Sequence, residues 1–386
     1  IISRNAPRLP QFRILRALSG GREASFIFAP RGAYNGGMQK IVAKVNLGAI
    51  ADNARYFRKL TGARLCAVVK ADAYGHGAEA VACALEGIAD MFAVALSDEG
   101  KALRTAACGK PVLVLTPPAD YAEAEALVEG GFIASVPDLW RAKLLAEAAE
   151  RKGKEVAVHL QANTGMNRYG TNLPGLGRIC RFLKGHPLVR AEGVYSHLYS
   201  HSREESERQR RLFVRAGEVC EEYYPGLCKH LSATYGALLG GEFSFDTVRI
   251  GLGLYGYLPE GSAFRPPLKK AMKVYARTIQ SRRYSRGGAG YGEPPAPLCR
   301  GEKMTVLRAG YADGFFRSAA NVGTGEANGT LSPLCMDACV VRGGTRPGGI
   351  VPVMTDADKA AADAGTISYE ILCAVTRRAE FVYEYE

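Results

Sequence analysis

Lys70 is the first residue of this chain whose type and position suggest covalent chemistry. It ends the apolar run that opens the segment AVVKADAYGHGA, residues 67–78. A lysine that follows three apolar residues is partly desolvated, which lowers its pKa and makes the neutral amine available for Schiff-base formation with a carbonyl compound. A lysine at a strand end is more often only a solvated flank, because single charges usually lie at the surface. The remaining sequence has to decide between these two interpretations.

Four more residues lie in segments that could contribute to such a site. His197 lies in VYSHLYSH, Arg249 in VRIGLGLYG and Tyr311 in RAGYADG, while Met336 lies in LCMDACVV. Taken singly, each has an ordinary structural explanation: a core histidine, an ion-paired surface arginine, a packing tyrosine at a turn and a core methionine. None of them identifies a function alone.

Short apolar runs alternate with helical patterns between residue 41 and about residue 270. In segments such as DLWRAKLLAEAAERKGK the apolar residues recur at helical spacing, and several such segments begin after a Ser, Asp or Thr that could cap a helix. The alternation predicts a parallel sheet, and the number of units favours an α/β fold of the (β/α)8 TIM-barrel type. Lys70 would then end a barrel strand, where such folds keep their reactive groups. The expected strands are residues 65–69, 91–95, 112–115, 133–136, 156–160 and 191–195.

The pattern changes after about residue 270. KVYARTIQSRRY, KMTVLRAG and ACVVRGG alternate in the manner of strands, and GTGEANGT is typical of a hairpin or loop. We therefore expect a barrel over residues 38–270, followed by a C-terminal, mostly β domain over residues 271–386. The segment VAKVNL could add a first strand to that β domain. Residues 1–37 are interpreted as a disordered leader or extension ahead of Met38.

Composition and charge argue against several other classes of protein. No apolar run approaches the roughly 18–20 residues of a membrane-spanning helix. The net charge is +12, but residues 1–37 supply five of these charges, and no basic cluster is interleaved with aromatic residues as in nucleic-acid modules. The ten cysteines include no C-x-x-C pair and none at zinc-site spacing with His. We expect no metal site and a reducing compartment, the cytoplasm.

Taken together, the segments around these residues resemble the alanine racemase family. AVVKADAYGHGA is similar to the family's cofactor-lysine signature, and VYSHLYSH, VRIGLGLYG, RAGYADG, LCMDACVV and TISYE follow in the family's order. The resemblance runs from about residue 39 to the C-terminus, and several motifs in one order are far more specific than any single motif. It implies an enzyme that uses pyridoxal 5'-phosphate to racemise L-alanine to D-alanine.

The resemblance implies a cofactor site in which Lys70 holds pyridoxal phosphate as a Schiff base. His197 matches the residue packed against the pyridine ring, and Arg249 matches the partner of the ring nitrogen. Because an arginine donates hydrogen bonds and keeps its proton, the ring would stay mostly unprotonated and act as a weaker electron sink. That should suppress side reactions such as transamination. The positions that match phosphate-binding residues are Tyr74, Thr234, Gly251 and Tyr369.

The resemblance also implies two catalytic bases, Lys70 and Tyr311. They would act from opposite faces of the substrate Cα, and nearby positive charge is required because tyrosine ordinarily titrates near a pH of about 10. Arg168, in NTGMNRYG, and Met336 match positions at the substrate carboxylate, through a guanidinium and a backbone N–H. The family places the tyrosine across a dimer interface. We therefore expect a homodimer with shared active sites, without nucleic-acid or membrane partners.

Three positions depart from the family pattern. Gln161 stands where many members carry a carbamylated lysine, whose negative charge holds the arginine that corresponds to Arg168. Asn163 replaces a common Asp, and Ala233 replaces an Asn that is common beside the phosphate site. We expect a carboxylate pocket that is less rigid or differently tuned, with activity retained because the lysine, the tyrosine and the ring arginine are present.

Other functions remain open at this stage. A racemase of the same architecture could prefer serine or accept many amino acids, although Tyr369 favours a small side chain. A pyridoxal-phosphate carrier or regulator without turnover would lack the β domain and the GYADG tyrosine. A basic-amino-acid decarboxylase shares both domains but has an acidic partner for the ring nitrogen, where this chain has Arg249. In an alanine racemase the usual use of D-alanine is bacterial cell-wall synthesis.

Overall fold

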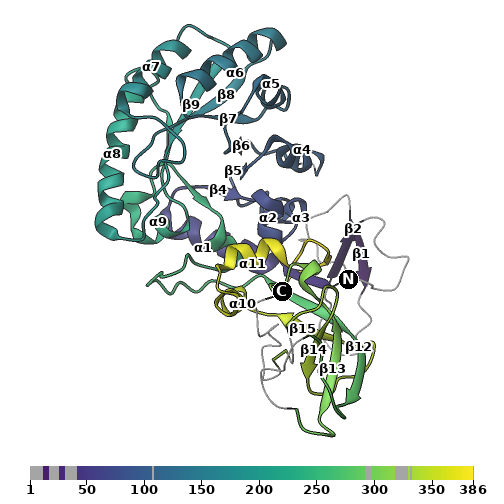
Figure 1. The fold of residues 1–386 in the computed structure, drawn as a ribbon. Helices are drawn as coiled ribbons and strands as arrows, with labels where there is room; N and C mark the ends of the chain where they lie inside the picture. The colour runs from purple at the N-terminus through teal and green to yellow at the C-terminus, as the bar shows by residue number, and fades with distance from the viewer. Residues whose placement is uncertain are drawn as a thin grey trace. The chain divides into compact units, whose positions relative to one another are not determined.

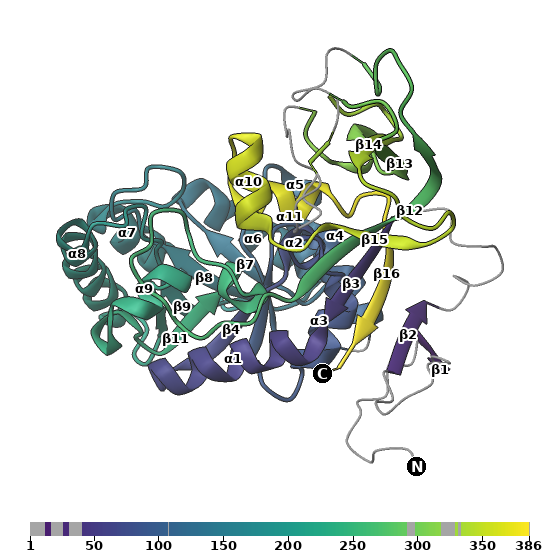
Figure 2. The same ribbon diagram turned by 90° about the horizontal axis from the view of Figure 1, so that it is seen from below.

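The computed structural model describes residues 41–106, 108–291, 298–317, 329–330 and 333–385, and the backbone of residues 12–16 and 26–30. The chain divides into two compact units, drawn in two views in Figures 1 and 2. We use the name barrel unit for residues 51–71 and 82–268, and the name β unit for residues 1–50, 72–81 and 269–386.

The barrel unit is built on eight parallel strands in the order β10-β9-β8-β7-β6-β5-β4-β11. The N–H of Asp246 donates to the carbonyl of Lys229 (3.1 Å), and the N–H of Arg249 donates to the carbonyl of Ser232 (2.9 Å). These bonds join the strands at the two ends of this order, β10 and β11, so the sheet closes into a barrel. The strands are β4 (Arg64–Val68), β5 (Met91–Val94), β6 (Val112–Val114), β7 (Ile133–Val136), β8 (Val156–Gln161), β9 (Val189–Tyr195), β10 (Cys228–His230) and β11 (Thr247–Ile250).

Helices alternate with these strands, and α4 to α8 lie around the outside of the barrel (Figure 1). Four of them begin as the sequence indicates: the side chains of Asp120, Asp138, Asn172 and Ser202 accept hydrogen bonds from backbone N–H groups of the first turn. The α-helices of this part of the chain are α1 (Leu47–Thr61), α2 (Lys70–Gly75), α3 (Ala78–Leu85), α4 (Ser97–Thr105), α5 (Tyr121–Glu129), α6 (Leu139–Lys152), α7 (Leu173–Leu183), α8 (Arg203–Glu221) and α9 (Thr234–Leu239).

The predicted fold class is confirmed by this arrangement. The six expected strands match β4 to β9 within two residues at each end. The sequence analysis did not identify β10 and β11, whose sequences CKH and TVRI contain charged and polar residues in place of an apolar run. Both become recognisable as strands only through their parallel pairing with β9 and β4.

The β unit contains a second sheet of eight strands, most of them antiparallel. β3 pairs with β12 in antiparallel and with β16 in parallel, so the segment VAKVNL belongs to this sheet (Figure 2). Two helices, α10 (Ala357–Ala364) and α11 (Ser368–Ala374), add to the mostly β content, and α11 carries Tyr369. The strands are β1 (Phe12–Arg16), β2 (Phe26–Pro30), β3 (Val42–Asn46), β12 (Met272–Arg283), β13 (Lys303–Arg308), β14 (Cys339–Arg342), β15 (Ile350–Met354) and β16 (Glu380–Glu384).

Two predictions concern residues that lie largely outside the described part of the chain. Of residues 1–37 the structure describes only β1 (Phe12–Arg16) and β2 (Phe26–Pro30), which pair in antiparallel. Of the segment GTGEANGT, residues 323–330, it describes only the last two. No helix in the described ranges is long and apolar enough to cross a membrane.

Candidate active site

The carboxyl ends of the barrel strands carry most of the predicted site residues. Lys70 comes shortly after β4, His197 after β9 and Thr234 after β10, while Arg249 is the third residue of β11. β11 pairs with β4 in parallel and places Arg249 opposite Cys66, so both strands end at the same rim. The barrel therefore brings to one rim residues that are far apart in the sequence, as expected for this fold.

Arg249 is the most strongly anchored of these residues and is only 4% exposed. Its Nη1 donates to Nδ1 (3.0 Å) and to the carbonyl oxygen (2.9 Å) of His230. Its Nη2 donates to the carbonyl oxygens of Ser196 (2.7 Å) and Leu231 (3.1 Å) and to Nδ1 of His197 (3.2 Å). These acceptors therefore occupy both terminal nitrogens, Nη1 and Nη2. Among the described residues no acceptor binds the Nε–H of this guanidinium, so that donor can bind a ligand.

The bonds to Arg249 determine the tautomers of the surrounding histidines. A guanidinium can only donate, so Nδ1 of His197 and Nδ1 of His230 must both be acceptors. Each ring then carries its proton on Nε2, and Nε2 of His230 donates to Nδ1 of His159 at 2.8 Å. The ring of Tyr195 stacks on His230, with centroids 5.0 Å apart, and closes the cluster from the side.

The electrostatic surroundings keep these imidazoles uncharged. Burial, followed by the positive charges of Arg249, Arg168 and Lys70, lowers the pKa of His197 to about 3. Burial and the charge of Arg249 likewise lower the pKa of His159 to about 3. Burial also holds the pKa of His230 well below its ordinary value. A fixed cation is thus surrounded by neutral rings, and the charges of Lys70 and Arg168 add to the effects that keep His197 neutral.

The backbone directly after Lys70 has an unusual conformation. The four residues 71–74 have φ between +51° and +54°, which makes a left-handed turn. Such a conformation costs about 1–2 kcal/mol per residue for L-amino acids, so neighbouring contacts must hold it. Asp72 supplies some of these contacts, because its carbonyl accepts the N–H of Gly77 (2.9 Å) and its Oδ1 accepts the N–H of Ala78 (2.7 Å) at the start of α3.

Glu99, in the first turn of α4, holds the other end of this turn. Its Oε1 accepts the N–H of Ala71 at 2.7 Å, directly after Lys70. Its Oε2 accepts the N–H groups of Ala95 (2.7 Å) and Leu96 (3.0 Å) at the end of β5. One carboxylate therefore connects the lysine segment to the neighbouring strand through short, charge-assisted hydrogen bonds.

Thr234 and Gly251 lie at a second part of the same rim. Thr234 begins α9, and its Oγ1 accepts the N–H of Gly253 (3.1 Å) in the turn that follows β11. Gly251 precedes that turn. A Cβ on Gly253 would lie 2.6 Å from the ring of Phe57 and 2.9 Å from Cγ2 of Thr234, so only glycine allows this close approach. The hydroxyl proton of Thr234 and nearby backbone N–H groups remain suited to an anionic group.

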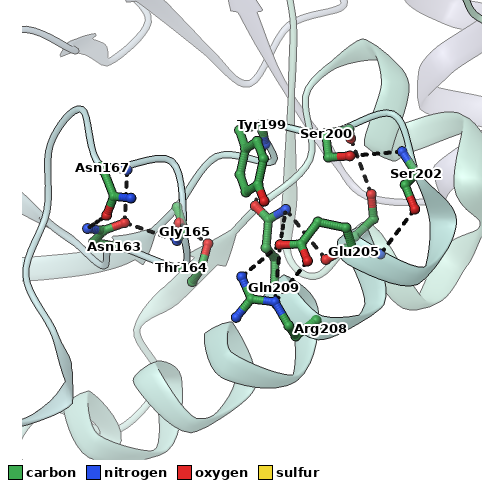
Figure 3. A network of polar contacts seen from close by, with 12 residues as sticks. Asn163, Thr164, Gly165, Asn167, Tyr199, Ser200, Ser202, Glu205, Arg208 and Gln209 are labelled. Carbon is green, nitrogen blue, oxygen red and sulfur yellow. Dashed lines mark hydrogen bonds and ion pairs between the residues drawn. The ribbon is translucent and has the colours of Figure 1, made fainter.

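Arg168 is exposed. In the sequence it directly follows Asn167, the last residue of a turn that Asn163 closes and that Figure 3 shows. Oδ1 of Asn163 accepts the N–H groups of Gly165 (3.0 Å) and Asn167 (3.2 Å), and its Nδ2 donates to Oδ1 of Asn167 (2.8 Å). The guanidinium of Arg168 lies over the ring of Tyr169, 5.8 Å from the centroid. The side-chain amide that replaces a carboxylate at position 163 thus serves both as acceptor and as donor within one turn.

In the β unit, the structure brings Tyr311 and Met336 together. The N–H of Tyr311 donates to the carbonyl of Cys335 (3.1 Å), and the N–H of Ala312 donates to the carbonyl of Met336 (2.9 Å). Gly310 allows this pairing, because a Cβ there would collide with the carbonyl oxygens of Cys335 and Met336. The side chains of Tyr311 and Met336 are 40% and 55% exposed, so the tyrosine is presented at the surface of its unit.

Arg378 holds the two segments of this pair. It forms ion pairs with Asp337 (Nη1 to Oδ1, 3.0 Å) and with Asp313 (Nε to Oδ1, 3.4 Å). Asp313 is buried, and its Oδ2 also accepts the N–H of Gly310 (3.0 Å). Arg378, a residue that the sequence analysis did not identify, therefore ties the segment of Asp313 to the segment of Asp337. Elsewhere in the β unit, the rings of Tyr74 and Tyr369 lie 5.9 Å apart.

The residues at the barrel rim suit an anionic ligand with an aromatic ring. Positive charge comes from Lys70, Arg168 and Arg249, and the neutral ring of His197 can pack against an aromatic group. Nε–H of Arg249 can donate to a ring nitrogen, while the Thr234 corner can take a phosphate. Among the described residues, no group of three or more His, Cys, Asp or Glu is arranged to hold a metal ion.

Comparison with known proteins places this site in a family. Residues 45–259 match the family described as alanine racemase, N-terminal domain, and residues 271–383 match alanine racemase, C-terminal domain. The chain belongs to the alanine racemase family. The residues described at the barrel rim lie within the first matched range, and Tyr311 and Met336 lie within the second.

Relatives in the family match over nearly their whole length. The alanine racemase of Synechocystis sp. is 32% identical over 371 residues, which cover 88% of this chain and 98% of the relative. That of Clostridium novyi is 30% identical over 383 residues, with 90% and 96% covered. The solved alanine racemase from Clostridium difficile has a TM-score of 0.84 at 28% identity, with 90% and 96% covered. The alanine racemase from Bartonella henselae, with covalently bound pyridoxal phosphate, has a TM-score of 0.78 at 25% identity, with 89% and 99% covered.

Two of the three departures from the alanine racemase pattern, Gln161 and Asn163, form local side-chain hydrogen bonds. Gln161 is buried, and its Oε1 accepts a hydrogen bond from Oγ of Ser135 (3.4 Å), which also bonds the hydroxyl of Tyr195. Ala233 precedes α9 without any side-chain cap. Among the described residues, Gln161 therefore turns toward Ser135, and Arg168 has no ion-pair partner. A differently tuned carboxylate pocket stays a prediction.

Sequence reasoning did not identify several residues that support the site. His159 and His230 lie within short strands, and Glu99 lies in the polar first turn of α4; none of them has a distinctive spacing in the sequence. His159 and His230 are 71 positions apart, and each appears in the sequence as an ordinary core histidine. Only pairing of β8 and β10 with the intervening β9 brings them within hydrogen-bonding distance.

Proposed function

We propose that this chain is a pyridoxal-phosphate-dependent alanine racemase that interconverts L- and D-alanine. The observation that carries the proposal is the cluster of Lys70, His197 and Arg249 at one barrel rim, with Nε–H of the buried arginine left for a ligand. Family membership over both domains agrees with it. The donor set also fits the cofactor, because it joins a reactive amine, an uncharged ring and donors for an anion.

The cofactor, when bound, supplies an aldehyde that takes up an amine and a ring that withdraws electrons from the substrate Cα. Lys70 would hold it covalently, His197 would pack against its ring, and Thr234 and Gly251 would bind its phosphate, together with Tyr74 and Tyr369. Arg249 would donate its Nε–H to the ring nitrogen and, because it keeps its proton, would leave that nitrogen unprotonated. The limited electron withdrawal favours simple proton exchange at Cα over transamination.

We assign the two proton transfers to Lys70 and Tyr311. Racemisation requires that a proton leaves one face of Cα and that another arrives on the opposite face. Two groups on opposite faces achieve this without any rotation of the substrate. Arg168 and the N–H of Met336 would hold the substrate carboxylate, which keeps Cα between the two bases. This assignment rests on the match to the family motifs.

The same assignment implies a homodimer in which one subunit contributes Lys70 and the other contributes Tyr311. The exposed position of Tyr311 in its unit agrees with a role at an interface. The ten cysteines, all described, are free thiols. They agree with the proposed reducing location, the cytoplasm, where D-alanine would serve cell-wall synthesis.

A direct test begins with purified protein supplied with pyridoxal phosphate. It should turn yellow, and borohydride should fix the cofactor irreversibly on Lys70, as read by mass spectrometry of the tryptic peptide. Loss of optical rotation from L-alanine, and from L-serine in parallel, then reports racemisation and substrate preference. Lys70→Ala should lose both colour and turnover. A coloured protein that leaves L-alanine and L-serine unchanged would support the carrier or regulator function instead.

The shared site can be tested by mixing inactive variants. Lys70→Ala and Tyr311→Phe subunits, exchanged after mild unfolding, form mixed dimers in which one of the two sites is intact if the residues come from different subunits. An equal mixture should then regain about a quarter of the parental activity, because about half of the dimers are mixed. If both residues of a site come from the same subunit, mixing restores nothing, and the interface assignment is wrong.

A further inference from the structure

Tyr199, Glu205 and Arg208 form a polar cluster next to the site, which we name the brace (Figure 3). The guanidinium of Arg208 donates three hydrogen bonds to the carboxylate of Glu205: Nε to Oε2 (2.9 Å), Nε to Oε1 (3.1 Å) and Nη2 to Oε1 (2.7 Å). The mutual hydrogen bonds of this pair, with a smaller contribution from the hydroxyl of Tyr199, lower the pKa of Glu205 and raise the pKa of Arg208. The brace thus links the loop after β9 to the first two turns of α8.

Gln209 connects the brace to the protein interior. Its side chain is fully buried, and its Nε2 donates to Oε1 of Glu205 (3.3 Å). Its Oε1 accepts the N–H of Tyr199 (3.4 Å). A buried amide therefore holds both the carboxylate and the tyrosine backbone, so the brace is more than an ion pair between two mobile surface side chains.

The brace contacts the turn that carries Arg168 at one residue, Gly165. A methyl group placed on Gly165 would lie 3.0 Å from Nη2 of Arg208 and 3.1 Å from Cε1 of Tyr199, so both side chains lie beside the face of Gly165 that a Cβ would occupy. Gly165 has φ +139°, and its N–H is bound by Asn163 Oδ1 together with the N–H of Asn167. Because one side chain ties these positions together, a shift at Gly165 moves the whole turn.

Arg168 depends on this turn for its position. It follows Asn167, which has φ +58° and is held by the same Asn163 side chain. Within the described residues no carboxylate forms an ion pair with Arg168, and its side chain lies over the neighbouring Tyr169 ring. The backbone of the turn, rather than a charged partner, therefore determines where the guanidinium lies.

We propose that Tyr199, Glu205 and Arg208 are positioning residues that hold the Arg168 turn against the barrel rim and thereby align Arg168 for a substrate carboxylate. The alignment of Arg168 for a substrate carboxylate rests on the proposed racemase function. The mechanical part of the proposal, that the brace holds the turn before Arg168, does not depend on that function. Arg168 touches the substrate, whereas the brace acts only through Gly165. Loosening the brace should change carboxylate binding and leave cofactor binding intact.

The chain offers a matched control on the same helix. Arg210 pairs with Glu207 (2.9 Å) at the same i,i+3 spacing as Arg208 with Glu205. Among the described residues, however, neither Arg210 nor Glu207 is one of the neighbours that a Cβ on Gly165 would meet. We therefore compare Arg208→Met with Arg210→Met. Tyr199→Phe is a second test, since it keeps the ring against Gly165 and removes only the hydroxyl from the brace.

In the holoenzyme, Arg208→Met should speed hydrogen exchange at the N–H groups of Gly165 and Asn167 by about ten-fold relative to Arg210→Met. The KM for alanine should rise on the order of ten-fold with a smaller change in kcat, and the visible absorbance and the Kd for pyridoxal phosphate should stay parental. Tyr199→Phe should shift both readouts in the same direction by less.

A double-mutant cycle with Arg168→Ala decides whether the brace works through Arg168. In that background Arg208→Met should cause no further rise in KM. Equal exchange rates in Arg208→Met and Arg210→Met would overturn the mechanical proposal, and a full additional loss in the Arg168→Ala background would overturn the link to the carboxylate. A parental protein that does not racemise alanine refutes the proposed function instead, and the exchange comparison still decides the brace.

Discussion

Replacement of Glu99 by glutamine tests how the segment after Lys70 is held. Glu99 accepts three backbone N–H groups, from Ala71 on Oε1 and from Ala95 and Leu96 on Oε2. A glutamine keeps one oxygen, which can stay with the pair at the end of β5. Its amide nitrogen then faces the N–H of Ala71, so a short hydrogen bond is replaced by two opposed donors.

The size of the effect follows from these contacts. A hydrogen bond to a charged group contributes about 1.5–3 kcal/mol, and the lost partner here belongs to a left-handed turn that itself costs about 1–2 kcal/mol per residue. We expect Glu99→Gln to lower the free energy of unfolding by about 2 kcal/mol. Glu99→Ala should lower it by about 1 kcal/mol more, since the cap at the start of α4 is lost as well. The matched control, Asp98→Asn, should change it by less than about 0.5 kcal/mol, because Asp98 is exposed and pairs only with Lys101 among the described residues.

Urea unfolding followed by circular dichroism measures these free energies, and borohydride trapping measures whether the amine of Lys70 still meets the cofactor. The expected order of destabilisation is Asp98→Asn, then Glu99→Gln, then Glu99→Ala, with slower trapping in both Glu99 variants. If Glu99→Gln is as stable as Asp98→Asn and traps the cofactor at the parental rate, the carboxylate does not hold the lysine segment and the reasoning fails.

Three further predictions follow from the site. Burial keeps the pKa values of His159, His197 and His230 far below 6.5 in the folded protein, so in acid the unfolded chain binds more protons than the folded chain. The free energy of unfolding should therefore fall between about pH 6.5 and 4, by up to about 1.4 kcal/mol per pH unit for each histidine. Urea titrations that show no such slope would contradict the burial of these histidines. Gly310→Ala should displace the Met336 segment, with a lower melting temperature and a fall in kcat/KM of on the order of a hundred-fold, and unchanged kinetics would show that this close contact is not needed. Tyr311→Phe should keep the yellow colour and lose most of the racemisation, so a parental rate would refute the two-base assignment.

Much of the fold could be predicted because its signals are local. Each of β4 to β9 contains a short buried run of mainly apolar residues, and each is followed by a helix that, in four cases, has a side-chain cap. These patterns depend on which residues avoid water within a single segment. The mostly antiparallel second sheet was indicated in the same way by alternating residues after position 270.

Parts of the fold without such signals were not predicted. β10 (CKH) and β11 (TVRI) lack an apolar run, and their strand conformation depends on partners 30 or more positions away. α10 and α11 interrupt a segment with strand-like neighbours on both sides. The left-handed turn at 71–74 contains no glycine, so no residue type marks it, and it persists only through contacts such as those of Asp72 and Glu99.

By itself the sequence determined the order of strands and helices, the place of Lys70 at a strand end and the set of motifs that point to one family. These are properties of neighbouring residues, and burial and backbone preference act on them locally. Only the tertiary structure decided that His159, His230 and Arg249 form one hydrogen-bonded chain and that Gly165 rests on the brace. Those contacts exist because barrel closure brings distant strand ends to one rim, and no local pattern encodes the distance between them.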